Sequence, residues 1–166
     1  MVVMADKSVP TSDHIRDIIS FVEASPTSYH AVAELTRRLE QAGFQRLEET
    51  ESWPSVEGRR YVVRDGAVIA WITPEKVTPQ LGARIVGSHT DSPSFKLKPN
   101  ATVTNQGWQQ VGMEVYGGGL LNSWLDRDLG LSGRLVTCDG QAHLVRTGPI
   151  LRISQLAPHL LSLIHI

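Results

Sequence analysis

The chain has 166 residues, 41% of them hydrophobic, and its 16 basic and 17 acidic side chains leave a formal net charge of -1. This length and hydrophobic content are enough to bury the core of one domain, or of one domain and part of another. The balanced charge excludes the broad positive field that nucleic-acid-binding and anionic-membrane-binding proteins use. The sequence also lacks the roughly 18 to 20 apolar residues in a row that a membrane span needs and the pattern of a secretory signal. We therefore expect a soluble, cytoplasmic protein without nucleic-acid or membrane partners.

The single cysteine, Cys138, excludes an internal disulfide and a cysteine-rich zinc module. An unpaired cysteine typically behaves as a small apolar side chain. We therefore expect Cys138 to be buried and not to act as a reactive thiol.

The amino-terminal region predicts two helices. Apolar residues recur at three- and four-residue spacing from Ile15 to Val22, behind polar residues that can cap a helix, which predicts an amphipathic helix over 13–24. The dipeptide Ser25-Pro26 ends it. A second helix is expected from Thr27 or Ser28 to Gln41 or Ala42. Its predicted buried face comprises Val32, Leu35 and Leu39, and Gly43 would follow its last turn in the left-handed conformation.

Three strands and a change of composition follow. Residues 61–64 and 67–72 flank the turn signal Asp65-Gly66 and predict a β-hairpin. The apolar run 83–87 predicts a buried strand. Past Pro99 the chain becomes polar and rich in glycine, which indicates a second module, and alternation over 111–116 predicts a strand in it.

The segment at 87–99, GSHTDSPSFKLKP, places His89 and Asp91 directly after the predicted buried strand. Catalytic groups of α/β enzymes often lie at strand ends. Residues i and i+2 of an extended segment share a face, so Asp91 can stand beside the His89 ring and fix its tautomer, or approach the same metal ion. The residues alone favour another reading, a hydrogen-bonded strand-end histidine followed by a turn-capping aspartate.

A second dense segment covers 116–135, YGGGLLNSWLDRDLGLSGRL. Its three consecutive glycines imply a turn or a close backbone approach that other residues would not tolerate. The tripeptide Asp126-Arg127-Asp128 places two carboxylates around one guanidinium, which favours a structural ion-pair turn over a loop that orients an active site.

Four separated blocks, in this order, resemble the aspartyl aminopeptidase family of zinc metallopeptidases (family M18). They are SPTSYHAVAELTRRLEQAGF at 25–44, GSHTDSPSFKLKP at 87–99, GWQQVGMEVYGGGLLNSWLDRDLGLSGRL at 107–135 and PILRISQLAPHL at 149–160. The resemblance covers nearly everything from Ile15 to His159.

This resemblance implies an α/β fold: a partial zinc-exopeptidase catalytic domain of the phosphorylase/hydrolase-like type, followed by part of an inserted β-rich oligomerisation domain. The expected domains are 1–98 for the catalytic part and 99–160 for the inserted part, with 161–166 as a non-native tail. The implied enzyme holds two zinc ions, removes acidic residues (Asp or Glu) from the amino ends of peptides, and assembles into a homo-oligomer, typically a dodecamer.

Carried onto this sequence, the resemblance implies that His89 is a zinc ligand, that Asp91 is the carboxylate supporting it in catalysis, and that His159 reaches a neighbouring subunit's active site. The family's other metal ligands and its catalytic glutamate lie downstream of residue 166. We therefore expect an amino-terminal part of an enzyme, inactive by itself. The alternatives are a non-catalytic oligomerisation module and another cocatalytic zinc hydrolase, such as a carboxypeptidase or amidohydrolase, and the GGGLLNSWLDRDL block argues against the latter.

Overall fold

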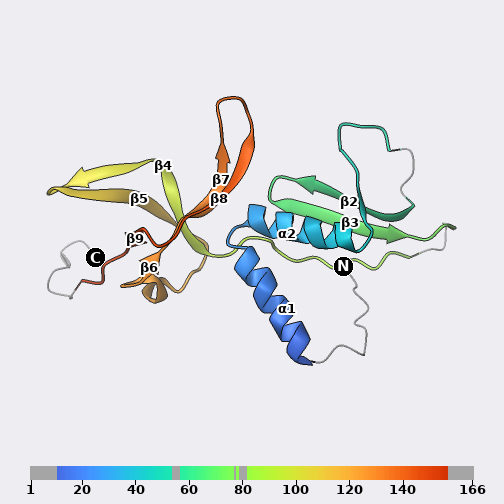
Figure 1. Cartoon of the computed structure of the whole chain (residues 1–166), viewed down its shortest axis with the longest axis horizontal. Coiled ribbons are helices and arrows are strands. Elements are labelled where there is room, and N and C mark those ends of the chain that lie inside the picture. Colours follow the sequence, from blue (N-terminus) through green and yellow to red (C-terminus); the bar gives the residue numbers. More distant parts are fainter. Residues whose placement is uncertain (1–10, 54–56, 77, 79–81, 157–166) are drawn as a thin grey trace. The chain divides into compact units, whose positions relative to one another are not determined.

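The computed structural model describes residues 11–53, 57–76, 78 and 82–156 (Figure 1). The chain divides into two compact units. The first runs to Asp91 and includes Gly133–Leu144, and the second comprises Ser92–Ser132 and the chain from Val145 onward. The expected boundary between residues 98 and 99 falls inside a strand of the second unit, β4 (Ser94–Asn105).

Both predicted helices of the first unit are confirmed. Helix α1 (Thr11–Ala24) begins slightly before its predicted start, and α2 (Ser28–Gln41) begins after Thr27, whose side-chain oxygen accepts a hydrogen bond from the His30 amide at 3.3 Å. Gly43, at φ 79°, adopts the left-handed conformation that ends α2. On the predicted inner face of α2, Val32 and Leu39 are buried and Leu35 is half-buried. The apolar side chains of α1 are more than half exposed: Ile15, Ile18, Ile19 and Val22.

A three-stranded sheet packs against α2. Its order is β1 (Gln45–Arg46), β2 (Gly58–Arg64) and β3 (Ala67–Thr73), with β1 parallel to β2 and β3 antiparallel to β2. The β2–β3 pair is the predicted hairpin, closed by Asp65-Gly66 with Asp65 at φ 51°.

Helix α2 lies over this sheet (Figure 1), and the core is formed here. Its buried apolar residues are Ala31, Val32 and Leu39 of α2 and Tyr61 and Val62 of β2. Tyr61 is fully enclosed, and its hydroxyl donates to the carboxylate of Glu40 on α2 at 2.7 Å. This contact joins the sheet to the helix through a polar group that would otherwise lose its hydration.

The predicted strand over 83–87 is wrong for this structure. Residues 82–93 form neither helix nor strand, and Ile85 and Val86 are exposed, Ile85 at 89%. An apolar strand of this type is stable only between paired neighbours and under covered faces. In the described ranges, the three-stranded sheet includes no partner for it.

The second unit is built from short antiparallel ladders. Strands β4 and β5 (Trp108–Tyr116) form a hairpin that contains the predicted strand 111–116, and β6 (Asp128–Leu129) pairs with β9 (Leu151–Arg152). A short 3-10 helix, η1 (Leu121–Trp124), lies between β5 and β6. A further hairpin, β7 (Ser132–Val136) with β8 (Ala142–Arg146), belongs for most of its length to the first unit.

The glycine-rich block behaves as predicted at its first residue. Gly117 has φ 71°, and a Cβ added there would lie 3.3 Å from Pro93, so both the conformation and the space favour glycine.

The Asp-Arg-Asp tripeptide differs from the expected ion-pair turn because its members bond to separate partners. Asp128 pairs with Arg152 at 2.6 Å across the β6–β9 ladder, whereas Arg127 donates to the carbonyl of Ser123 at 3.3 Å.

The prediction of a buried Cys138 is wrong. Cys138 is exposed because it lies in the turn between β7 and β8, outside both strands.

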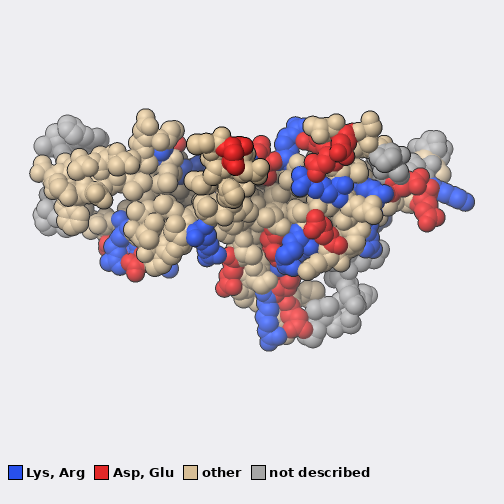
Figure 2. Space-filling model, turned by 45° about the horizontal axis from the view of Figure 1, so that its top comes forward, with Lys and Arg blue, Asp and Glu red and all other residues tan. Residues whose placement is uncertain are grey.

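Acidic and basic side chains lie side by side over the first unit (Figure 2), as in the pairs Arg38–Asp17 and Arg64–Glu49 at 2.7 Å each. None of the helices in the described part of the chain combines the length and apolar character that a membrane crossing requires.

Candidate functional site

His89 and Asp91 lie close together on the irregular segment that ends the first stretch of unit one. The Nδ1 atom of His89 is 2.7 Å from the backbone carbonyl oxygen of Asp91 and 3.5 Å from its carboxylate oxygen Oδ1. The shorter contact fits a tautomer in which Nδ1–H donates to the carbonyl. This tautomer leaves the lone pair on Nε2, and the ring is 79% exposed.

Asp91 therefore holds the ring chiefly through its main chain. The sequence spacing predicted that the two side chains lie close together. The structure shows that the shorter contact joins the His89 ring to the Asp91 backbone carbonyl. The Asp91 side chain is 46% exposed and lies near the imidazole. Its negative charge would stabilise a metal cation bound to the His89 ring.

Thr90, between these two residues, ties the segment to the rest of the first unit. Its hydroxyl donates to the carbonyl oxygen of Gly66, in the β2–β3 turn, at 2.7 Å. Gly66 in turn lies directly against the start of α2, because a Cβ added to it would be 2.7 Å from Ser28 Oγ. Sequence reasoning identified the Asp65-Gly66 turn as a hairpin connection only, and the pattern contains no local signal for its contacts with Thr90 and Ser28.

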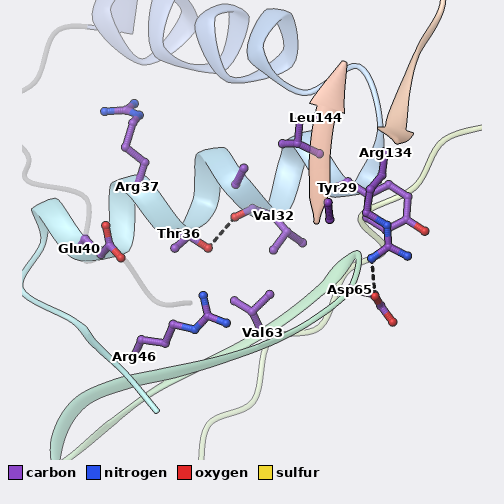
Figure 3. Close-up of a pocket in the computed structure, with 12 residues that line it drawn as sticks. Tyr29, Val32, Thr36, Arg37, Glu40, Arg46, Val63, Asp65, Arg134 and Leu144 are labelled. Carbon is purple, nitrogen blue, oxygen red and sulfur yellow. Dashed lines mark hydrogen bonds and ion pairs between the residues drawn. The ribbon is translucent and has the colours of Figure 1, made fainter. Parts of the chain in front are cut away.

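The neighbouring residues of the turn are also fixed. Arg134 of β7 donates to the carboxylate of Asp65, and its guanidinium carbon lies 4.3 Å from the ring centroid of Tyr29 (Figure 3). The hydrogen bond to Asp65 raises the pKa of Arg134 above its ordinary value. These contacts hold the β2–β3 turn between the start of α2 and the β7–β8 hairpin.

A pocket of about 500 Å³ lies beside this turn within the first unit (Figure 3). Its apolar lining comes from α2, β2 and the β7–β8 hairpin and comprises Val32, Ala33, Val63, Ala142 and Leu144. The arginines around it are paired with carboxylates in the contacts Arg37–Glu34, Arg46–Glu48 and Arg134–Asp65. The described residues that line it do not include His89, so the pocket and the histidine are separate features.

The residues around His89 fit one corner of a metal site. An exposed imidazole with one nitrogen held by a carbonyl and the other available is the usual arrangement of a zinc-ligating histidine. Within the ranges that the structure describes, no group of three His, Cys, Asp or Glu side chains could hold a metal ion. His159, the third expected site residue, lies outside the described residues.

The comparisons with known proteins agree on one family. The family model described as aminopeptidase I zinc metalloprotease (M18) matches residues 21–165. A probable M18 family aminopeptidase 2 of Streptomyces avermitilis is 53% identical over 148 residues, which make up 89% of this chain and 34% of that protein.

Solved structures give the same result. The dodecamer structure of S. cerevisiae mApe1 matches with a TM-score of 0.79 and 32% identity, over 89% of this chain and 36% of that one. An M18 aminopeptidase of Thermotoga maritima matches with a TM-score of 0.75 and 26% identity, over 90% and 34%. The chain thus spans about a third of the length of the curated relatives it matches. It belongs to the M18 family of zinc metalloproteases and carries part of the family's aminopeptidase fold.

Proposed function

We propose that the chain is part of a zinc aminopeptidase that removes acidic residues, Asp or Glu, from the amino ends of peptides. The observation that carries the metal assignment is the His89 ring, exposed and oriented by the Asp91 carbonyl so that Nε2 is available. Membership of the M18 family supports the reaction class. The acidic preference rests on the resemblance of the four sequence blocks.

In the complete protein, His89 would hold one of two zinc ions, and Asp91 would orient the imidazole and add negative charge beside it. Zinc bound there supplies Lewis-acid activation of the scissile carbonyl and of a water molecule. One imidazole does not hold zinc against water, because the affinity of such sites comes from a full ligand set. The 166 residues by themselves are therefore inactive in this proposal, and the remaining ligands belong to the rest of a longer polypeptide.

The proposed assembly is a homo-oligomer, as in the dodecamer structure of mApe1. The short antiparallel ladders of the second unit suit an oligomerisation domain, because two-stranded hairpins are marginal in isolation and gain stability from neighbours. His159 would face a neighbouring subunit's active site. The enzyme would act on peptides in the cytoplasm.

The test uses the complete open reading frame and aminoacyl substrates with acidic or neutral first residues, with and without a chelator. His89→Ala should lower the activity by about 100-fold or more. His143→Ala is the matched control, because His143 is an exposed histidine of β8, and it should retain normal activity. Activity that survives both chelation and the loss of His89 would end the zinc assignment, and equal rates on neutral and acidic substrates would end the acidic preference.

A further inference from the structure

The segment that carries His89 is anchored through the residue beside it. Residues 82–93 lack regular structure, and Ile85, Val86 and His89 are exposed. Thr90 is half-buried, and its hydroxyl donates to the Gly66 carbonyl oxygen at 2.7 Å. We propose that Thr90 is a positioning residue for the metal site, a proposal that rests on the assignment of His89 as a zinc ligand.

The acceptor of this hydrogen bond is held in place by two independent contacts. A Cβ on Gly66 would lie 2.7 Å from Ser28 Oγ and 3.1 Å from Ser28 Cβ, so the turn lies directly against the first turn of α2. The adjacent Asp65 is paired with Arg134. The Gly66 carbonyl is therefore held in place within the first unit. Its hydrogen bond with the Thr90 hydroxyl fixes the position of segment 82–93 relative to the β2–β3 turn.

The geometry around Thr90 explains why the imidazole depends on it. The 2.7 Å contact between His89 Nδ1 and the Asp91 carbonyl closes a loop whose central residue is Thr90. A change in the Thr90 backbone would turn the Asp91 carbonyl away from the ring and release the tautomer that exposes Nε2. An outer partner of this kind is typically worth about 10-fold or more in metal affinity.

The experiment compares the complete protein with its Thr90→Val and Thr90→Ser variants. Valine keeps the shape and removes the donor, whereas serine keeps the donor. Three properties are measured: zinc affinity by competition with a chromogenic chelator, visible absorption of the cobalt-substituted protein, and hydrogen exchange over 82–93 in the metal-free protein. We expect Thr90→Val to weaken zinc binding about 10-fold, to alter the cobalt spectrum and to speed hydrogen exchange over 82–93. Thr90→Ser should keep the wild-type zinc affinity, cobalt spectrum and exchange rate.

The outcomes separate this proposal from the proposed function. If the wild-type protein binds no zinc, the metal assignment fails, and exchange over 82–93 alone then decides whether Thr90 anchors the segment. Wild-type zinc affinity in Thr90→Val, or equal losses in the valine and serine variants, would overturn the positioning role.

A second pair of variants keeps the test decisive if Thr90→Val does not fold. Gly66→Ala should shift the turn relative to α2, because its Cβ would lie 2.7 Å from Ser28 Oγ and 3.1 Å from Ser28 Cβ, and should weaken zinc binding through the displaced acceptor. Ser28→Gly removes the opposing side chain and should restore the affinity of the Gly66→Ala protein. Failure of the double variant to recover, with the metal-free fold intact, would contradict the proposed link from α2 through the turn to Thr90.

Discussion

The enclosed tyrosine of the first unit gives the most quantitative prediction. Tyr61 is fully buried, and its hydroxyl donates to the exposed Glu40 at 2.7 Å. Burial, and then this hydrogen bond, raise the pKa of Tyr61 from 10.0 to about 12. Tyr61→Phe keeps the ring and removes the hydroxyl. At neutral pH the loss of this hydrogen bond should lower the free energy of unfolding by about 1 kcal/mol. The loss is no larger because Glu40 is exposed and its carboxylate regains water.

The sign of the pH dependence follows from the raised pKa. The folded state favours the neutral phenol, so this contribution to stability is complete below pH 10.0 and is lost as the pH rises toward about 12. At about pH 11 the wild type should have lost about 1.4 kcal/mol, whereas the Tyr61→Phe protein has no such loss. The free energies of unfolding of the two proteins should therefore become equal just below about pH 11, and above it the Tyr61→Phe protein should be the more stable one.

Two assays check this prediction. Denaturant unfolding followed by circular dichroism gives the free energies. Tyrosinate absorption of the wild type minus that of Tyr61→Phe isolates one phenol, because Tyr29 and Tyr116 cancel in the difference. A phenol that titrates at its ordinary value of 10.0, or a stability difference that is constant across this pH range, would refute the burial of the Tyr61 hydroxyl and its hydrogen bond to Glu40.

Three further predictions concern single side chains. The pKa of Glu34 is lowered from 4.5 to about 2 by hydrogen bonds from Arg37 and Arg38. The contribution of Glu34 to the free energy of unfolding should therefore be present above pH 4.5 and lost as the pH falls toward 2. Acid unfolding of the Glu34→Gln protein should lack this loss. The core substitution Leu39→Ala should cost about 2 to 4 kcal/mol in denaturant unfolding, whereas Leu120→Ala, at 77% exposure, should cost less than about 0.5 kcal/mol. Cys138 should react with a thiol reagent without denaturant because it is exposed, and labelling only after unfolding would contradict its place in the β7–β8 turn.

The sequence predicted the local elements of the first unit well because their causes are local. The spacing of apolar residues and the Asp65-Gly66 turn determine helices and a hairpin within a few neighbouring residues. The strand predicted at 83–87 failed for the opposite reason. A strand needs partners that local sequence does not reveal. None of the described strands pairs with 83–87, and Ile85 is exposed there.

The candidate site was predicted in the same partial way. Spacing brought His89 and Asp91 together, but the closer contact uses the Asp91 main chain, which carries no side-chain signature. The anchor from Thr90 to Gly66 joins residues that are 24 positions apart. Such a contact depends on how the turn packs against α2, and only the folded arrangement reveals it.

The proposed function requires His89 to ligate zinc through Nε2. Anomalous diffraction at the zinc edge, from crystals of the complete protein, tests it most directly. We expect a peak about 2.0 to 2.1 Å from Nε2 of His89, with Nδ1 still facing the Asp91 carbonyl. A zinc peak bound elsewhere with the His89 ring unligated, or one bound to Nδ1, would contradict it.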